Sequence, residues 1–116
     1  MPNVRLGRKY YFSALHTIPQ EDFVHGHNYE LDVLVSGNID ESGLVFSRET
    51  LDQLVKDHFI SHFDRRWVND HVLPATGENL AQYAFDKIAD SLPKEVRLVE
   101  LQLHETRKNS FTAISQ

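Results

Sequence analysis

Residues 24–36 alternate between polar and apolar side chains over most of their length, which is typical of a β-strand with one buried face. Successive side chains of a strand point to opposite faces of the sheet, so residues of one parity share a face. The apolar parity carries His25, His27, Tyr29, Leu31, Val33 and Val35, while from residue 26 on Leu34 is the one large apolar side chain of the other parity. The pattern therefore aims two histidines into the face that should be buried.

Two neutral imidazoles in an apolar region leave ring nitrogens without partners, and a metal ion would satisfy both. His16 lies upstream on another strand-like stretch and shares its parity with Phe12 and Ala14. Three inward histidines suit a zinc site of the catalytic type, which keeps one coordination position open. The alternative is that they are ordinary strand-end histidines, because the chain has 7 of them and a lone His-x-His is a weak motif.

Composition limits the class of protein. A chain of 116 residues predicts one domain, residues 1–116, with a modest core. The net charge of −5 argues against nucleic acid as a partner, and the absence of cysteine excludes disulfides and thiol chemistry. Residues 1–9 carry charges without an apolar run, and no window reaches the length of a membrane span. We therefore expect a cytoplasmic protein without a membrane partner.

The order of elements predicts an α+β fold. Strands are expected at 5–15, 24–36, 96–106 and 111–115, with a short one at 44–46. Ser47 and Thr76 are expected to cap two helices, Pro93 to end the second, and residues 63–75 to be irregular. This order favours a four-stranded antiparallel sheet with two antiparallel helices on one face. The open edges of such a sheet are commonly covered by another subunit, so we expect a homo-oligomer.

Glu105 continues the apolar parity of the 96–106 strand, which it shares with Val99, Leu101 and Leu103. A buried carboxylate is costly unless it is paired. Its partner would be an arginine, a metal, or a ligand with adjacent N–H groups. The alternative is that the strand has already emerged into solvent at this position.

These pieces, in their order and spacing, resemble the 6-pyruvoyl-tetrahydropterin synthase / 6-carboxy-tetrahydropterin synthase family over nearly the whole chain. The resemblance is carried by residues 12–16 (FSALH), 25–29 (HGHNY), 43–45 (GLV), 63–64 (FD) with 68–69 (VN), 76–81 (TGENLA) and 105–106 (ET). It implies a T-fold, in which trimers close their sheets into a barrel and two trimers usually stack as a hexamer.

The resemblance also implies ligands. It implies zinc on the three histidines, which here are His16, His25 and His27. It implies a glutamate, here Glu105, that anchors a pterin ring through the 2-amino group and a ring N–H. Thr106 and Thr76 are then expected nearby in the substrate pocket. The family substrate is 7,8-dihydroneopterin triphosphate.

Departures from the family pattern bear on the reaction. The family uses a cysteine shortly before His-Gly-His and an Asp-His pair, whereas this chain has Glu21 near the cysteine position, Asp64 kept, and Arg65 in place of the histidine. The first change resembles the branch with glutamate in place of the cysteine, which cleaves the substrate side chain to give 6-hydroxymethyl-7,8-dihydropterin. Arg65 stays protonated and cannot be a base, although it can hold phosphate. His71 stands nearby as a candidate base.

We therefore predict a zinc-dependent pterin lyase, with Glu21 and Asp64 as catalytic residues and Arg65 as a substrate-binding residue. Three alternatives stay open. One is a 6-carboxy- or 6-pyruvoyl-type lyase with an altered proton relay, which leaves the pathway, folate or queuosine, undecided. Another is an inactive paralogue that binds a pterin or purine. The third is a cupin-like metal site, against which the paired helices argue.

Overall fold

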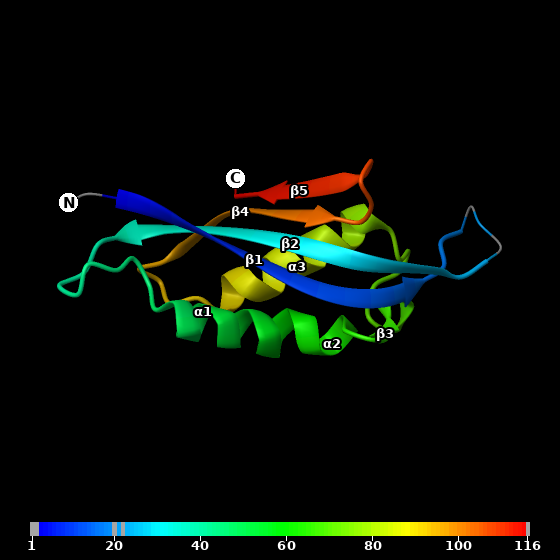
Figure 1. Ribbon diagram of the computed structural model, residues 1–116, viewed down its shortest axis with the longest axis horizontal. Coiled ribbons are helices and arrows are strands. Elements are labelled where there is room, and N and C mark those ends of the chain that lie inside the picture. Colours follow the sequence, from blue (N-terminus) through cyan, green and yellow to red (C-terminus); the bar gives the residue numbers. More distant parts are fainter. Residues whose placement is uncertain (1–2, 20, 22, 116) are drawn as a thin grey trace.

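The computed structural model describes residues 3–19, 21 and 23–115. Its centre is a five-stranded sheet with the order β3-β1-β2-β4-β5, and helical segments cover one face of it (Figure 1). The strands are β1 (Asn3–His16), β2 (His25–Asn38), β3 (Arg66–Trp67), β4 (Arg97–His104) and β5 (Ser110–Ile114). The helical segments are α1 (Arg48–Val55), the π-helical η1 (Lys56–Ile60), α2 (Ser61–Phe63), the 3-10 helix η2 (Val68–Asp70) and α3 (Gly77–Ser91).

The predicted α+β class is confirmed, but the sheet is not the expected four-stranded antiparallel one. Strands β1, β2, β4 and β5 do pair antiparallel. The fifth strand, β3, runs parallel to β1 and pairs with Ala14 and Leu15. It lies within the 63–75 stretch, where no periodicity in the sequence marks a strand this short.

The short strand expected at 44–46 is absent from the structure. Instead, the Asp40 carboxylate accepts hydrogen bonds from the backbone N–H groups of Ser42 and Leu44 at 2.8 and 3.1 Å. These bonds fold the chain into a turn, because an aspartate side chain competes with ladder pairing for nearby backbone donors. Helix α1 then begins after Ser47, whose hydroxyl caps it as predicted.

The core lies between the helical segments and the inward parity of the long strands. Leu31, Val33 and Val35 of β2 are at most 1% exposed, as the alternation predicts. Helices α1 to α2 and α3 meet this face with apolar stripes: Leu51, Val55, Phe59 and Phe63 from the first, and Leu80, Ala81, Ala84 and Ile88 from the second. Burial of such side chains contributes about 1.5–3 kcal/mol each for the large ones.

The long β1–β2 hairpin brings the chemistry-bearing residues together. Its register places His16 opposite His25 and Ala14 opposite His27. Cross-strand partners share a face, so all three histidines lie on the inward side at one end of the hairpin. Within the described part of the chain, no helix is long and apolar enough to cross a membrane.

Candidate active site

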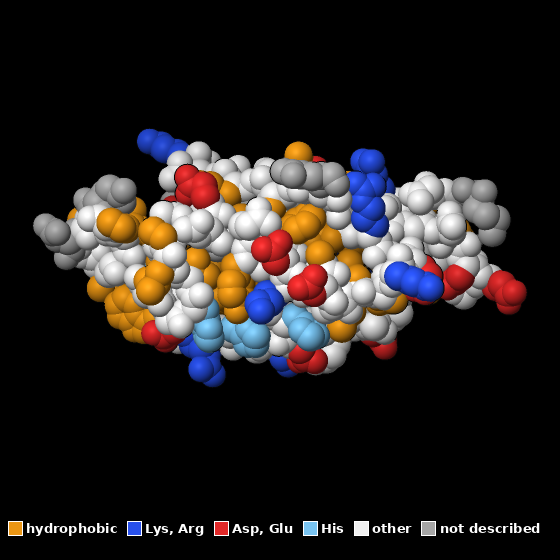
Figure 2. Space-filling view, turned by 180° about the vertical axis from the view of Figure 1, so that it is seen from behind, with side chains coloured by type: hydrophobic (Ala, Val, Ile, Leu, Met, Phe, Trp, Pro, Cys, Tyr) orange, Lys and Arg blue, Asp and Glu red, His pale blue; other side chains and the backbone are white. Residues whose placement is uncertain are grey.

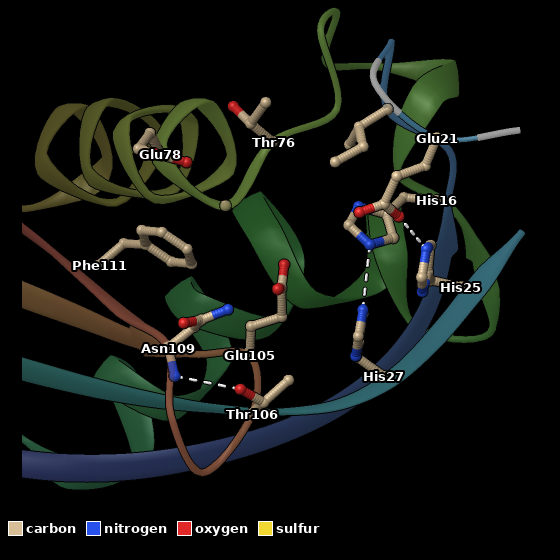
Figure 3. A pocket seen from close by; sticks show the side chains of 12 residues that line it. His16, Glu21, His25, His27, Thr76, Glu78, Glu105, Thr106, Asn109 and Phe111 are labelled. Atoms are coloured by element: carbon tan, nitrogen blue, oxygen red, sulfur yellow. Dashed lines mark hydrogen bonds and ion pairs between the residues drawn. The ribbon is translucent and has the colours of Figure 1, made fainter. Parts of the chain in front are cut away.

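The three histidines open into a cavity of about 650 Å³ at the end of the sheet (Figure 3). The N-terminal turn of α3, the β4–β5 loop and the loop between β1 and β2 form its other walls. The lining residues are His16, Ile18, Glu21, His25, His27, Thr76, Gly77, Glu78, Glu105, Thr106, Asn109 and Phe111. The cavity therefore collects most of the site residues predicted from the sequence.

His16 is held in one tautomer. Its ring is 4% exposed, and Nδ1 lies 2.8 Å from the carbonyl oxygen of Ala75. A carbonyl only accepts, so Nδ1 carries the proton and donates. In the neutral ring, Nε2 then carries the lone pair and accepts from Nε2 of His27 at 3.1 Å.

The surroundings of His27 favour its neutral form. Burial lowers the pKa of its imidazole, and the neighbouring rings of His16 and His25 lower it further, against the opposing charges of Glu105 and Glu21. A neutral imidazole is the form that ligates a metal. His16 and His27 therefore place two Nε2 atoms at close range, where a metal ion would replace the hydrogen between them.

Glu105 forms a candidate metal group with two of the histidines. One ligand atom each from His16, His27 and Glu105 lies within 4.8 Å of the others. Strand β4 ends at His104, so Glu105 stands just past its end and is half-buried, with its side chain pointing into the cavity (Figure 3). The Glu105 side chain thus points to the side predicted from its parity on the strand, although the residue is not fully buried.

His25, the third histidine expected from the sequence, stands beside this group. Its ring centroid lies 5.7 Å from that of His16 and 5.8 Å from that of His27. Its Nε2 contacts Oε2 of Glu21, so an imidazole and a carboxylate meet at the edge of the group (Figure 3). Nitrogen and carboxylate donors in this number fit a divalent transition metal.

Glu21 reaches the cavity from the loop between β1 and β2. Its backbone N–H donates to the carbonyl of Ile18 at 3.0 Å, which closes a tight turn. The side chain then extends towards the histidines (Figure 3). The loop carries no periodicity, so this placement was expected from the family resemblance alone.

The two threonines expected in the pocket do line it, and each also shapes the backbone. The Thr76 hydroxyl accepts from the N–H of Asn79 at 3.2 Å and caps α3. The Thr106 hydroxyl accepts from the N–H groups of Lys108 and Asn109, both at 3.1 Å. Each hydroxyl keeps its own hydrogen for donation to a ligand.

Asp64 and Arg65 do not line the histidine cavity. The chain leaves α2 and crosses the edge of β1 at Ser13, whose N–H donates to the Asp64 carboxylate at 3.0 Å. The Arg65 N–H donates to the Ser13 carbonyl at 2.6 Å, and Arg65 has a left-handed φ of 60°. Both residues line a smaller cavity of about 340 Å³ with Asn28 and Glu30. Within one chain they are therefore separate from the metal group.

His71 also lies outside the cavity. Its ring packs on Phe63 and His62, with centroid distances of 5.3 and 5.7 Å. Histidine side chains gather on the surface of the molecule as well, where they face solvent (Figure 2). The structure gives no support to His71 as a displaced base within this chain.

Several lining residues were missed by reasoning from the sequence. Gly77 is one: a Cβ built there would lie 2.0 Å from the Phe111 ring, so only glycine lets α3 approach β5 this closely. Glu78 lies in the first turn of α3, where a negative charge interacts favourably with the helix dipole. Its presence in the sequence is explained by that interaction, so nothing pointed to a place in the cavity. Ile18 and Asn109 lie in loops and carry no signal in the sequence.

Comparison with known proteins places this site in a family. The family model for 6-pyruvoyl tetrahydropterin synthase matches residues 5–115. A 6-pyruvoyl tetrahydrobiopterin synthase of Drosophila melanogaster is 35% identical over 91 residues, which cover 73% of this chain and 54% of that protein. The chain thus spans about half the length of that relative. A dihydroneopterin monophosphate aldolase of Pyrococcus furiosus is 33% identical over 96 residues, 81% of this chain and 82% of that protein.

A solved structure of the same family has the same fold as this chain. The 6-pyruvoyl tetrahydropterin synthase of Caenorhabditis elegans superposes with a TM-score of 0.85 at 26% identity, and the alignment covers 100% of this chain and 98% of that one. The fold is therefore the T-fold expected from the resemblance. With the family model matched from residue 5 to residue 115, the chain belongs to the 6-pyruvoyl tetrahydropterin synthase family.

Proposed function

We propose that this chain is a zinc-dependent lyase that cleaves the side chain of 7,8-dihydroneopterin triphosphate to give 6-hydroxymethyl-7,8-dihydropterin. The observation that carries the proposal is the Glu21 carboxylate, which lines the cavity against His25 in a chain without cysteine. A carboxylate is a weaker base than a thiolate, so it favours taking a proton from an acidified hydroxyl over taking one from carbon. The chain is similar both to a synthase and to an aldolase. The identity of the product would therefore decide between the two reactions.

His16, His25 and His27 would hold the zinc ion. The close approach of the His16 and His27 Nε2 atoms, with the His25 ring beside both, supports this assignment. When bound, zinc would supply Lewis-acid chemistry that lowers the pKa of the substrate hydroxyls.

Glu21 would take the proton of the side-chain hydroxyl on C2′. A carbonyl then forms at C2′ and the C1′–C2′ bond breaks, with its electron pair passing to C1′. The C6=N5 double bond of the dihydropterin is conjugated with C1′ and delocalises that pair. Protonation of C1′ gives the hydroxymethyl product, and the two-carbon fragment leaves as glycolaldehyde carrying the phosphates.

Glu105 would anchor the pterin ring, with Thr76 and Thr106 as neighbouring contacts. Two adjacent N–H groups of a pterin match the two oxygens of a carboxylate. Glu105→Gln keeps the shape but turns one acceptor into a donor that faces ligand N–H groups. Pterin affinity, measured by fluorescence titration, should fall by at least about 2 kcal/mol, the scale for a lost charged hydrogen bond with a partner left unpaired.

Metal content measured on the same variant separates two roles of Glu105. Zinc should be retained, because the three histidines remain. Unchanged pterin affinity would remove Glu105 from the ligand site. Loss of zinc would instead assign Glu105 to the metal, as its nearness to His16 and His27 allows.

Asp64 and Arg65 would act on the site of a neighbouring copy, with Arg65 on the phosphates. The described structure supports association, because β1 pairs on its outer edge with only the two residues of β3. Large hydrophobic side chains are also exposed near the end of β1 that pairs with β3: Leu15, Phe23, Val24, Trp67 and Leu73. Exposed patches of this kind mark association surfaces. We propose a trimer or a hexamer, which the molecular mass in solution would test.

Mass analysis of the product tests the reaction. Purified, zinc-loaded protein is incubated with 7,8-dihydroneopterin triphosphate and, separately, with the monophosphate. We expect 6-hydroxymethyl-7,8-dihydropterin, and none of it from chelator-treated protein. A 6-pyruvoyl or 6-carboxy pterin would favour the alternative lyases, and pterin binding without turnover would indicate an inactive paralogue.

A further inference from the structure

Two asparagines hold the surroundings of His16 in place. The ring of His16 takes its orientation from the Ala75 carbonyl, to which Nδ1 donates at 2.8 Å. Both residues are buried, at 4% and 1% exposure. The direction of the His16 Nε2 lone pair therefore depends on the Ala75–Thr76 peptide and on the backbone where β1 ends.

Asn79 fixes the residues on both sides of Ala75. Its side-chain Nδ2 donates to the carbonyl of Pro74 at 3.0 Å. Its backbone N–H donates to the hydroxyl of Thr76 at 3.2 Å. The Asn79 side chain is exposed, so it adds no core packing, and the bond to Pro74 is its contact with the rest of the fold.

Asn69 fixes the backbone immediately after His16. Strand β1 ends at His16, so Thr17 has no ladder partner. Asn69 replaces that partner: its Oδ1 accepts from the Thr17 N–H at 3.0 Å, and its Nδ2 donates to the Thr17 carbonyl at 3.0 Å and to the hydroxyl at 3.2 Å. The same contact sets where the loop that carries Glu21 begins.

We propose that Asn69 and Asn79 are positioning residues for the metal ligand His16. The inference rests on the proposed function, because it assumes that His16 binds the metal. Groups that orient a ligating histidine typically change metal affinity by about 10- to 100-fold when they are removed. Asn79 acts through the Ala75 carbonyl that accepts from the His16 ring, and Asn69 acts through the backbone that follows His16. The effects of the two asparagines should therefore be separable.

The test is zinc affinity by chelator competition, together with the visible absorption spectrum of the cobalt-substituted protein. Asn69→Ala and Asn79→Ala should each weaken zinc binding about tenfold or more and change the cobalt spectrum. Asn79→Ala keeps the backbone N–H that is capped by Thr76, so it removes only the bond to Pro74.

Ser47→Ala is the matched control. It also removes a hydrogen bond between a side chain and the backbone, in which the Ser47 hydroxyl accepts from the Thr50 N–H at 3.2 Å, and Ser47 does not line the cavity. It should lower the unfolding temperature without changing zinc affinity or the cobalt spectrum. Asn69→Asp serves if Asn69→Ala fails to fold, since it keeps the acceptor for Thr17 and loses both donated bonds.

The outcomes distinguish this inference from the proposed function. Wild-type protein that binds no zinc would overturn the proposed function. Wild-type protein that binds zinc, with both asparagine variants matching it in affinity and spectrum, would overturn the positioning role alone. An equal loss of zinc affinity in Ser47→Ala would show that general stability, and not orientation of His16, is responsible.

Discussion

Replacing His16 with alanine is expected to abolish stoichiometric metal binding. Wild-type protein should hold about one zinc per chain, as a site of this type does, and the variant should hold almost none after dialysis. His16 is the most buried of the three histidines, and its tautomer places the lone pair on Nε2, the atom that would bind a metal. The variant also loses the contact between His16 and His27. The metal would then be held by two histidines only, without the ligand whose orientation is fixed by Ala75.

Elemental analysis measures the metal content, and thermal unfolding gives an independent readout. Zinc in about 1,000-fold excess over its Kd should stabilise the wild-type fold by about 4 kcal/mol and leave the variant unchanged. His71→Ala is the matched control, because His71 lies outside the cavity. Metal that stays stoichiometric in a variant lacking His16, His25 and His27 together would contradict the site.

A comparison of His25→Ala with Glu105→Gln then identifies the third ligand. The sequence pattern and the family resemblance favour His25. The structure places the Glu105 carboxylate near His16 and His27 and leaves His25 against Glu21. The variant that loses more zinc marks the residue that binds it.

The part of this site that could be predicted from the sequence is the part that lies on strands with alternating polar and apolar residues. The inward parity of β2 carries His25, His27 and the core residue Val33, and the hairpin register then fixes His16 opposite His25. The alternation along β4 also predicted the side to which Glu105 points, because the alternation continues for one residue past the end of the strand. Periodicity is local, and each of these predictions depends on one strand.

The remaining features depend on contacts between segments that no local pattern encodes. The path of residues 63–75 places Asp64 and Arg65 against Ser13, away from the cavity, and builds the two-residue strand β3. The packing of Gly77 on Phe111 is likewise a tertiary contact. Glu21 lies in a loop, where only the family resemblance pointed to its role.

Replacing Glu21 with alanine is expected to abolish formation of 6-hydroxymethyl-7,8-dihydropterin. The chain has no thiol, and Glu21 is the carboxylate of the cavity that contacts a histidine. Loss of a general base costs about 100- to 10,000-fold in rate. Zinc content and pterin affinity should persist, because the variant keeps His16, His25 and His27 for the metal and Glu105 for the pterin. Single-turnover assays with mass detection measure the loss.

Two further variants separate the chemistry of Glu21 from its volume and charge. Glu21→Gln keeps the shape and removes the base, so it should be as inactive as Glu21→Ala. Glu78→Gln removes a different carboxylate that lines the same cavity from the first turn of α3, and it should retain turnover. Full activity in Glu21→Ala, or a product that is only a 6-carboxy or 6-pyruvoyl pterin, would contradict this mechanism. The remaining candidates for the proton acceptor would then be the carboxylates of Glu78 and Glu105 in the same cavity and Asp64 of a neighbouring copy, since Arg65 stays protonated.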